Sequence, residues 1–132
     1  MEKIKIKTNK RVELIDITGQ VQAAATKLKI DSGVCFVFCP HTTAGLTVNE
    51  NADPAVKSDI INALNKIIPA DAGYAHSEGN SDSHLKSSLF GPDLSILVEN
   101  GALSLGAWQA VYFCESDGPR PREVWIKVIE GK

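Results

Sequence analysis

The sequence predicts a single-domain α+β sandwich that combines a largely antiparallel sheet with two to three helices. Its 132 residues match the usual size of one domain, and we find no internal repeat or low-complexity segment within residues 1–132. Two segments with apolar side chains at helical spacing lie in the first half of the chain, whereas the last third alternates apolar and polar residues between turns. Runs of strands and helices that do not strictly alternate are typical of α+β domains.

The composition is that of an ordinary globular protein, and it argues against a membrane or a nucleic acid as the partner. Hydrophobic residues make up 43% of the chain, yet no apolar run approaches the ~20 residues that a membrane helix needs. The amino-terminal residues lack the apolar segment of a secretory signal. The 14 basic and 16 acidic residues are well mixed and give a net charge of −2, unlike the basic footprint of a nucleic-acid binder. We therefore expect a cytoplasmic protein that binds neither nucleic acid nor membrane.

The first elements are predicted to be a β-hairpin followed by a helix. Residues 2–8 alternate lysine with isoleucine, and residues 11–17 show a second strand pattern after the turn residues between them. Thr18 is a suitable N-cap for a helix over about residues 19–29, whose apolar side chains recur at helical spacing.

The next two elements are a buried strand and a long helix. Residues 33–39 are apolar on both faces, which predicts a central strand in a sheet that is covered on both sides. A helix over residues 54–67 is predicted from Asp53 as N-cap, Pro54 as the first helical residue and an apolar stripe that continues until Pro69.

The second half begins with a loop and ends in strands. Residues 69–81 show no clean period, and a short helix follows that is capped near Ser81 and ended by Gly91 and Pro92. Loops of this length are often functional. Strand patterns then cover residues 94–99, 107–115 and 123–130, with the turn dipeptide Asn100–Gly101 after the first of them. The final third is therefore predicted to be an antiparallel meander.

The three cysteines are predicted to be reduced and structural. Cys35 and Cys39 lie four residues apart in a strand, which separates their Cα atoms by about 13 Å. A disulfide requires a separation below about 7 Å. Cys114 lies in an alternating strand pattern, and a nucleophilic role for its thiol is the less favoured alternative.

All three histidines lie in polar connecting segments, where binding groups are often held on a rigid scaffold. His41 follows the end of the predicted central strand, and His76 and His84 lie on either side of the Gly79 turn. We predict that their imidazoles meet in one pocket, where they would suit Zn²⁺ or a similar metal with an open coordination position. The alternative is that each histidine is a hydrogen-bonded structural residue and that His41 caps its strand.

Carboxylates and arginines add to this predicted site. Glu50 is a candidate general base, metal ligand or partner that orients an imidazole, with a solvated loop residue as the alternative. Arg120 and Arg122 alternate with prolines, so that two guanidinium groups about 6.5 Å apart point the same way and fit a phosphate or pyrophosphate. The alternative is that both arginines pair with Glu115 and Asp117.

The segments "PHTTAGLTVNENADP", "YAHSEGNSDSHLKSSLFG", "LSLGAWQ" and "ESDGPRPR", in this order, resemble the YjbQ-like family over nearly the whole chain. Ala107 departs from the family motif, which usually has Thr before Trp-Gln. The resemblance implies an α+β domain, a homotrimer and a polar site at the positions His41, His76, Asn80, His84, Glu115, Asp117 and Arg120.

The resemblance also implies an activity, because members of the family are often labelled secondary thiamine-phosphate synthases. That reaction joins hydroxymethylpyrimidine diphosphate to thiazole phosphate with loss of pyrophosphate, and it would need a phosphate clamp and Mg²⁺. Two alternatives remain. One is a metal-dependent hydrolase or lyase that acts on a small phosphorylated metabolite through three histidines, and the other is a ligand-binding trimer without catalysis.

The complete expectation is an enzyme with a divalent metal, Zn, Mn or Mg, and no organic cofactor. The predicted catalytic residues are His41, Glu50, His76, His84, Glu115 and Asp117. The predicted substrate-binding residues are Thr42, Asn80, Arg120 and Arg122, and the predicted metal ligands are His41, His76 and His84.

Overall fold

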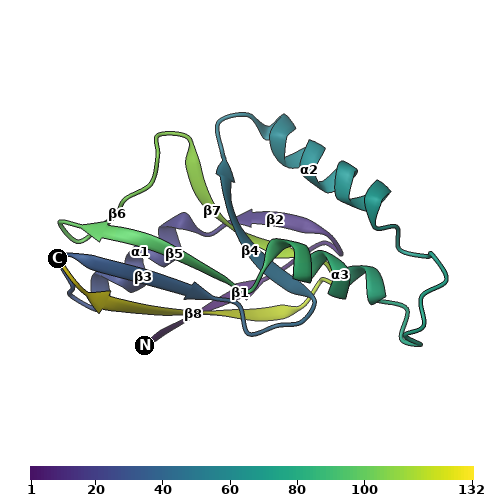
Figure 1. Ribbon diagram of the computed structural model, residues 1–132, viewed down its shortest axis with the longest axis horizontal. Helices are drawn as coiled ribbons and strands as arrows, with labels where there is room; N and C mark the ends of the chain where they lie inside the picture. Colours follow the sequence, from purple (N-terminus) through teal and green to yellow (C-terminus); the bar gives the residue numbers. More distant parts are fainter.

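The computed structural model describes residues 1–132 and contains two sheets and three helices (Figure 1). In chain order the elements are β1 (Glu2–Lys7), β2 (Glu13–Asp16), α1 (Thr18–Lys27), β3 (Gly33–Phe38), β4 (Ala44–Glu50), α2 (Pro54–Ile67), α3 (Ser81–Phe90), β5 (Asp93–Glu99), β6 (Ala102–Leu103), β7 (Gln109–Glu115) and β8 (Pro121–Glu130). The five-stranded sheet has the order β1-β8-β3-β5-β6, and the three-stranded sheet has the order β2-β7-β4. Every strand pair is antiparallel, so the predicted α+β sandwich is confirmed.

The main hydrophobic core lies between the two sheets. Val37 and Ile126 of the large sheet and Phe113 of the small sheet are fully buried there, together with Val21 of α1. A smaller core on the other face of the small sheet is built around Tyr112 and is covered by apolar residues of α2 and α3. The small sheet is therefore the middle layer of the molecule, with helices outside it (Figure 1).

The predicted opening hairpin is wrong. β1 pairs with β8 in the large sheet, and β2 pairs with β7 in the small sheet. The segment between β1 and β2 does not fold back on itself, because its backbone bonds to the segment that connects β7 and β8. The N–H of Thr8 donates to the carbonyl of Arg120, and the N–H of Gly118 donates to the carbonyl of Arg11.

The predicted C-terminal meander is also wrong, because β7 and β8 belong to different sheets. The chain instead changes sheets between these strands, over residues 116–120. Strand β4 was not predicted, since the polar residues that follow His41 suggested a connecting segment. It pairs with β7 over its whole length, from Ala44 opposite Glu115 to Glu50 opposite Gln109.

The helices lie close to their predicted positions. Asp53 caps α2 as expected, with its carboxylate accepting the N–H of Ala55 at 2.9 Å. Thr18 is not the N-cap of α1, because its hydroxyl donates to Asp16 and accepts the N–H of Val111. Residue Ile17 occupies the cap position without a side-chain hydrogen bond.

The outer face of the large sheet is not covered within the chain. Strand β3 is central as predicted, but Phe36 and Phe38 on this face are 38% and 41% exposed. Leu97 and Ile129 are exposed as well, and Trp125 stacks beside Phe38 with ring centroids 5.8 Å apart. The expectation of a sheet covered on both sides is therefore not met by one chain alone.

Two further expectations concern the cysteines and the membrane. All three cysteines are buried free thiols, as predicted, and burial raises the pKa of Cys35 to about 11. None of the three helices is both long enough and apolar enough to span a bilayer.

Candidate active site

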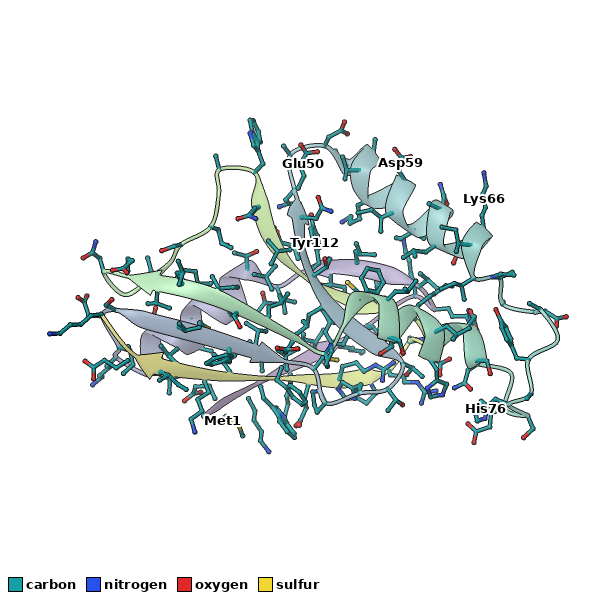
Figure 2. All side chains as sticks on the ribbon, in the orientation of Figure 1. Met1, Glu50, Asp59, Lys66, His76 and Tyr112 are labelled. Atoms are coloured by element: carbon teal, nitrogen blue, oxygen red, sulfur yellow. The ribbon has the colours of Figure 1, made fainter.

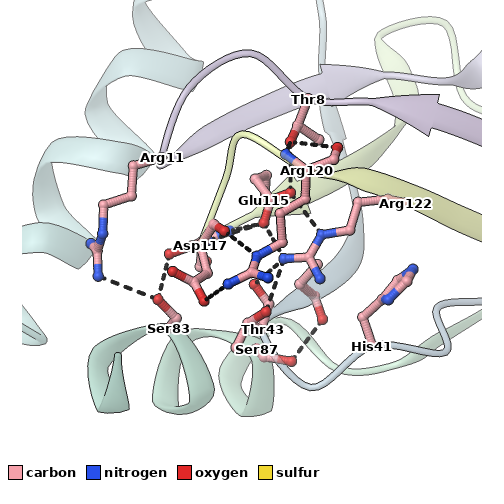
Figure 3. Close-up of polar contacts among 12 residues, drawn as sticks. Thr8, Arg11, His41, Thr43, Ser83, Ser87, Glu115, Asp117, Arg120 and Arg122 are labelled. Atoms are coloured by element: carbon pink, nitrogen blue, oxygen red, sulfur yellow. Dashed lines mark hydrogen bonds and ion pairs between the residues drawn. The ribbon is translucent and has the colours of Figure 1, made fainter. Parts of the chain in front are cut away.

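Most of the predicted site residues line one polar pocket of about 370 Å³. It lies where the β3–β4 connection, the start of α3 and the β7–β8 connection meet (Figure 3). Its walls are formed by Pro40, His41, Thr42, Thr43, Glu78, Asn80, His84, Asp117, Arg120 and Arg122. Apart from Pro40, every residue of this wall is polar or charged, so the pocket suits a small and strongly polar ligand.

A buried ion pair between Arg122 and Glu115 forms the back of this site. The Nε of Arg122 donates to Glu115 Oε2 at 2.8 Å and an Nη donates to Oε1, so the pair is bidentate. The two side chains are 5% and 0% exposed. The hydroxyl of Thr8 donates to the same carboxylate at 2.8 Å, and the N–H of Asp117 donates at 3.0 Å. The pairing that the sequence offered as an alternative is therefore present for both arginines, because Arg122 pairs with Glu115 and Arg120 pairs with Asp117.

The pKa of Glu115 reflects this environment. Burial alone would raise it, because an ionised carboxylate loses its hydration. The hydrogen bonds from Arg122, Asp117 and Thr8 outweigh burial and hold the pKa of Glu115 below its ordinary value. Both members of the pair are therefore charged, and each neutralises the other. The guanidinium of Arg122 is committed to Glu115, which leaves it little capacity to bind substrate.

Gly118 allows the connecting segment to approach the carboxylate. A Cβ at this position would lie 2.2 Å from the carbonyl oxygen of Lys10 and 2.8 Å from the hydroxyl of Thr8. Both distances are far inside van der Waals contact, so only glycine fits here. The sequence "DGPRPR" is thus explained by close packing as well as by its arginines.

Arg120 has a different environment from Arg122, although the two residues alternate in sequence. Its side chain is 51% exposed, and its guanidinium is held by Asp117 through the backbone carbonyl at 2.7 Å and the carboxylate at 2.8 Å. The amide of Asn80 donates to the same carboxylate at 3.0 Å. Arg120 precedes β8, so the predicted pair of parallel guanidinium groups is not formed. One is buried, and the other faces the pocket.

His41 is held as a neutral imidazole. The backbone N–H of Glu123 donates to its Nε2 at 2.9 Å, and its ring packs edge-on against Phe113 with centroids 6.4 Å apart. Burial lowers the pKa of His41, and the positive charge of Arg122 lowers it further. A neutral imidazole that accepts at Nε2 carries its proton on Nδ1. The carbonyl of Glu123 also lies 3.2 Å from Nε2, so the proton is on Nδ1 in the tautomer that accepts the Glu123 N–H and on Nε2 in the tautomer that donates to this carbonyl.

His84 lines the pocket, and His76 contacts it from outside. The two rings are perpendicular with centroids 5.4 Å apart. His76 lies on the loop before α3, with its Nε2 3.7 Å from the carboxylate of Glu78, and its side chain is 42% exposed (Figure 2). His76 on this loop and His84 on α3 thus lie at one end of the molecule, but His76 does not line the pocket in which all three imidazoles were predicted to meet.

The donor set does not fit the predicted three-histidine metal site. No three side chains of His, Cys, Asp or Glu lie close enough together to hold an ion. The lone pair of His41 Nε2 accepts the backbone N–H of Glu123, so this nitrogen is not free to bind a metal. The carboxylates of Glu115 and Asp117 are paired with arginines and offer no open ligand set for Mg²⁺.

Glu50 does not line the pocket where the other predicted site residues gather. It ends β4, whose first residue Ala44 lies next to the pocket, and six residue steps along a strand cover about 20 Å. Its backbone carbonyl accepts the hydroxyl of Tyr112 at 3.0 Å. Figure 2 shows Glu50 and His76 far apart on the molecule.

Sequence reasoning missed the residues that hold α3 in place. Asp82 is fully buried and accepts two hydrogen bonds from Arg11, at 2.9 and 3.0 Å, while Lys86 lies 3.4 Å away. Burial alone would raise the pKa of Asp82, but the hydrogen bonds and charges of Arg11 and Lys86 lower it. The hydroxyl of Ser83 donates to the carbonyl of Ser116. These bonds fix the helix that carries His84, and only the unusual polarity of "SDSH" could have signalled them.

The fold and the site together define a class of protein, a small antiparallel sandwich with a polar arginine- and histidine-lined pocket at one end. The chain belongs to the family described as UPF0047 protein YjbQ-like, whose model matches residues 2–131. It is 51% identical to UPF0047 protein MJ1081 of Methanocaldococcus jannaschii over 130 residues, 98% of this chain and 94% of the relative. It is 48% identical to UPF0047 protein YugU of Bacillus subtilis, over 98% of both chains.

Solved structures agree with the fold. An uncharacterized conserved protein of the YjbQ/UPF0047 family from Clostridium acetobutylicum has a TM-score of 0.95 and 48% identity, covering 98% of this chain and 100% of that one. A conserved hypothetical protein from Thermus thermophilus has a TM-score of 0.91 and 42% identity over 98% and 100% of the two chains. None of these descriptions states an activity, so the chemistry must be argued from the pocket.

The Arg122–Glu115 pair should dominate the stability of this end of the molecule. Glu115→Gln keeps the shape of the side chain and leaves a buried guanidinium without its counter-ion, a change that costs about 3–5 kcal/mol in typical proteins. We expect a lower free energy of unfolding by that amount in urea at neutral pH. Glu130→Gln, at an exposed position, is the matched control and should have no effect.

The pH dependence of the free energy of unfolding offers a result that would contradict this prediction. Because the folded pKa of Glu115 is lowered, its contribution is complete above the ordinary value of 4.5 and is lost as pH falls through the folded pKa. The wild type should lose this contribution to its free energy of unfolding in acid, and Glu115→Gln should lack the contribution at every pH. Equal acid dependence of both proteins would mean that the pair does not stabilise the fold.

Proposed function

We propose that this protein is an enzyme that binds a small phosphorylated metabolite in the polar pocket and acts on it by acid–base chemistry. One observation carries the proposal: Arg120 faces the pocket with its guanidinium already oriented by Asp117. A fixed planar guanidinium can donate two parallel hydrogen bonds to a phosphate, and little side-chain entropy remains to be lost on binding.

The remaining pocket residues support distinct roles. In the tautomer that accepts the N–H of Glu123 at Nε2, His41 would donate a hydrogen bond from Nδ1 to a ligand oxygen. His84 has no such backbone bond to a ring nitrogen and would transfer the proton. Thr42 and Thr43 add hydroxyl groups to the same wall. Arg122 and Glu115 would act through position and charge, without touching the ligand.

Within this class, the specific reaction that the family resemblance implies is the joining of hydroxymethylpyrimidine diphosphate to thiazole phosphate. A departing pyrophosphate needs stabilisation of its negative charge, which Arg120 would provide. The metal-dependent hydrolase or lyase is less well supported, because the histidines do not form its ligand set. A ligand-binding trimer without catalysis would use the same arginine and would differ only in the role of His84.

The first test of this proposal concerns phosphate recognition. Arg120→Lys replaces a planar fork by a point charge, and we expect it to weaken inorganic phosphate or pyrophosphate binding by about 1–3 kcal/mol, the typical strength of hydrogen bonds to charged groups. Isothermal titration calorimetry measures the change. Lys66→Ala removes one positive charge from the exposed side of α2 and should bind as the wild type does (Figure 2). Unchanged affinity in Arg120→Lys would refute the phosphate site.

The second test separates catalysis from binding. Incubation of the protein with a phosphorylated-metabolite mixture, followed by mass spectrometry, should identify a compound that is consumed. His84→Gln should then lower turnover by about 10²–10⁴-fold, the usual contribution of a general acid or base, and leave the dissociation constant nearly unchanged. Equal loss of binding and turnover would assign His84 to ligand recognition, and no consumed compound would favour the binding trimer.

We further propose that the protein is a homotrimer. The apolar part of this face around Phe36, Leu97 and Ile129, away from edge strand β1, supports this assembly because monomers rarely expose large apolar patches. Light scattering should give about three times the chain mass of 14.2 kDa. Phe36→Asp should reduce that mass, and Ile67→Asp, at the exposed end of α2, should not. A wild-type mass equal to one chain would contradict the proposal.

A further inference from the structure

A second and larger cavity adjoins the polar pocket. Its volume is about 870 Å³, within the usual range of about 300–1,000 Å³ for ligand sites. It is lined by Lys5, Ile6, Lys7, Thr8, Pro40, His41, Pro119, Arg120, Pro121, Arg122, Glu123 and Trp125. Four of these residues, Pro40, His41, Arg120 and Arg122, also line the polar pocket. A ligand held by Arg120 therefore has room to extend in this second direction, which we call the lysine groove.

The lysines of this groove come from the edge strand β1. Their positions follow from the strand period, because Ile6 points into the core at 7% exposure while Lys5 and Lys7 are exposed on the opposite side. Lys7 lies opposite Pro121 in the sheet, and Thr8, the next residue, bonds to the backbone of Arg120. Cations thus follow one another along this edge, with the two lysines about 7 Å apart.

The lysine groove has an excess of positive charge. Lys5 and Lys7 take part in none of the ion pairs of the protein. The charge of Arg122 is cancelled by Glu115. The single acidic residue on its wall is Glu123, whose carboxylate accepts the indole N–H of Trp125 at 3.1 Å. Prolines and the indole ring of Trp125 provide the apolar part of the wall.

We infer that the ligand carries a second anionic group, which binds to Lys5 and Lys7 while the first is held by Arg120. The chemical class is a bisphosphate whose two phosphates lie at opposite ends of one carbon skeleton. The skeleton would pass His41 and lie against the prolines and Trp125. This inference rests on the proposed phosphate site at Arg120 and adds the requirement for a second charge. Glu123 lies opposite Lys5 in the sheet and offsets one of the two ammonium charges, whereas Lys7 lies opposite Pro121, so a monophosphate at Arg120 would leave the groove with an uncompensated positive charge at Lys7.

The test compares two probes that differ by one phosphate, fructose 6-phosphate and fructose 1,6-bisphosphate. Calorimetric titration at constant ionic strength should show that the wild type binds the bisphosphate about tenfold more tightly or better, as expected when a second charge-assisted contact forms. The double variant Lys5→Ala/Lys7→Ala should bind both probes with the wild-type affinity for the monophosphate. The control Lys66→Ala/Lys127→Ala removes the same charge elsewhere and should retain the preference.

The outcomes separate this inference from the proposed function. Equal affinity of the wild type for the two probes would overturn the bisphosphate class and leave the phosphate site intact. If the control Lys66→Ala/Lys127→Ala also loses the preference for the bisphosphate, general charge attraction explains the preference and the bisphosphate class is overturned. If Arg120→Lys lowers the affinity for neither probe, the proposed phosphate site itself is refuted. Circular dichroism of each variant confirms that the fold is unchanged.

Discussion

The buried ion pair between Arg122 and Glu115 is the interaction on which this end of the molecule depends. Glu115 ends β7 in the small sheet and Arg122 is the second residue of β8 in the large sheet, so the pair joins the two sheets where the chain passes between them. Thr8 from the end of β1 and Thr43 from the start of β4 bond to the same two side chains. Because removing charges from water is costly, the arrangement is stable only with all of these hydrogen bonds present.

The same pair determines which cation is available to a ligand. Arg122 is buried with Glu115, whereas Arg120 pairs with Asp117 at the pocket wall and is 51% exposed, and burial together with the charge of Arg122 lowers the pKa of His41. The fold therefore produces the electrostatics of the site, with one oriented cation, one neutral donor and one histidine without a backbone bond to its ring. This combination suits phosphate binding and proton transfer, and it offers few free lone pairs to a metal.

Local features were predictable from the sequence, and long-range pairing was not. Helix α2 was correctly predicted because its cap at Asp53 and its apolar stripe lie within the helix itself. The opening hairpin failed because β1 and β2 each pair with strands more than ninety residues later, and nothing in their own residues identifies those partners. Polar connecting segments pointed to His41 and His84, which line one pocket, yet the same reasoning included Glu50, which strand β4 carries away from that pocket.

The arginines show why residue spacing alone could not decide their roles. Two residues at positions i and i+2 share a face only if both belong to one extended strand. Only Arg122 belongs to strand β8, where it points inward in register with Ile6. Arg120 precedes β8 and bonds to Asp117. The separation depends on Gly118, since any side chain there would meet Lys10 and Thr8 and push the segment away from Glu115. A single glycine therefore allows one arginine to be buried with Glu115 while the other stays half-exposed at the pocket wall.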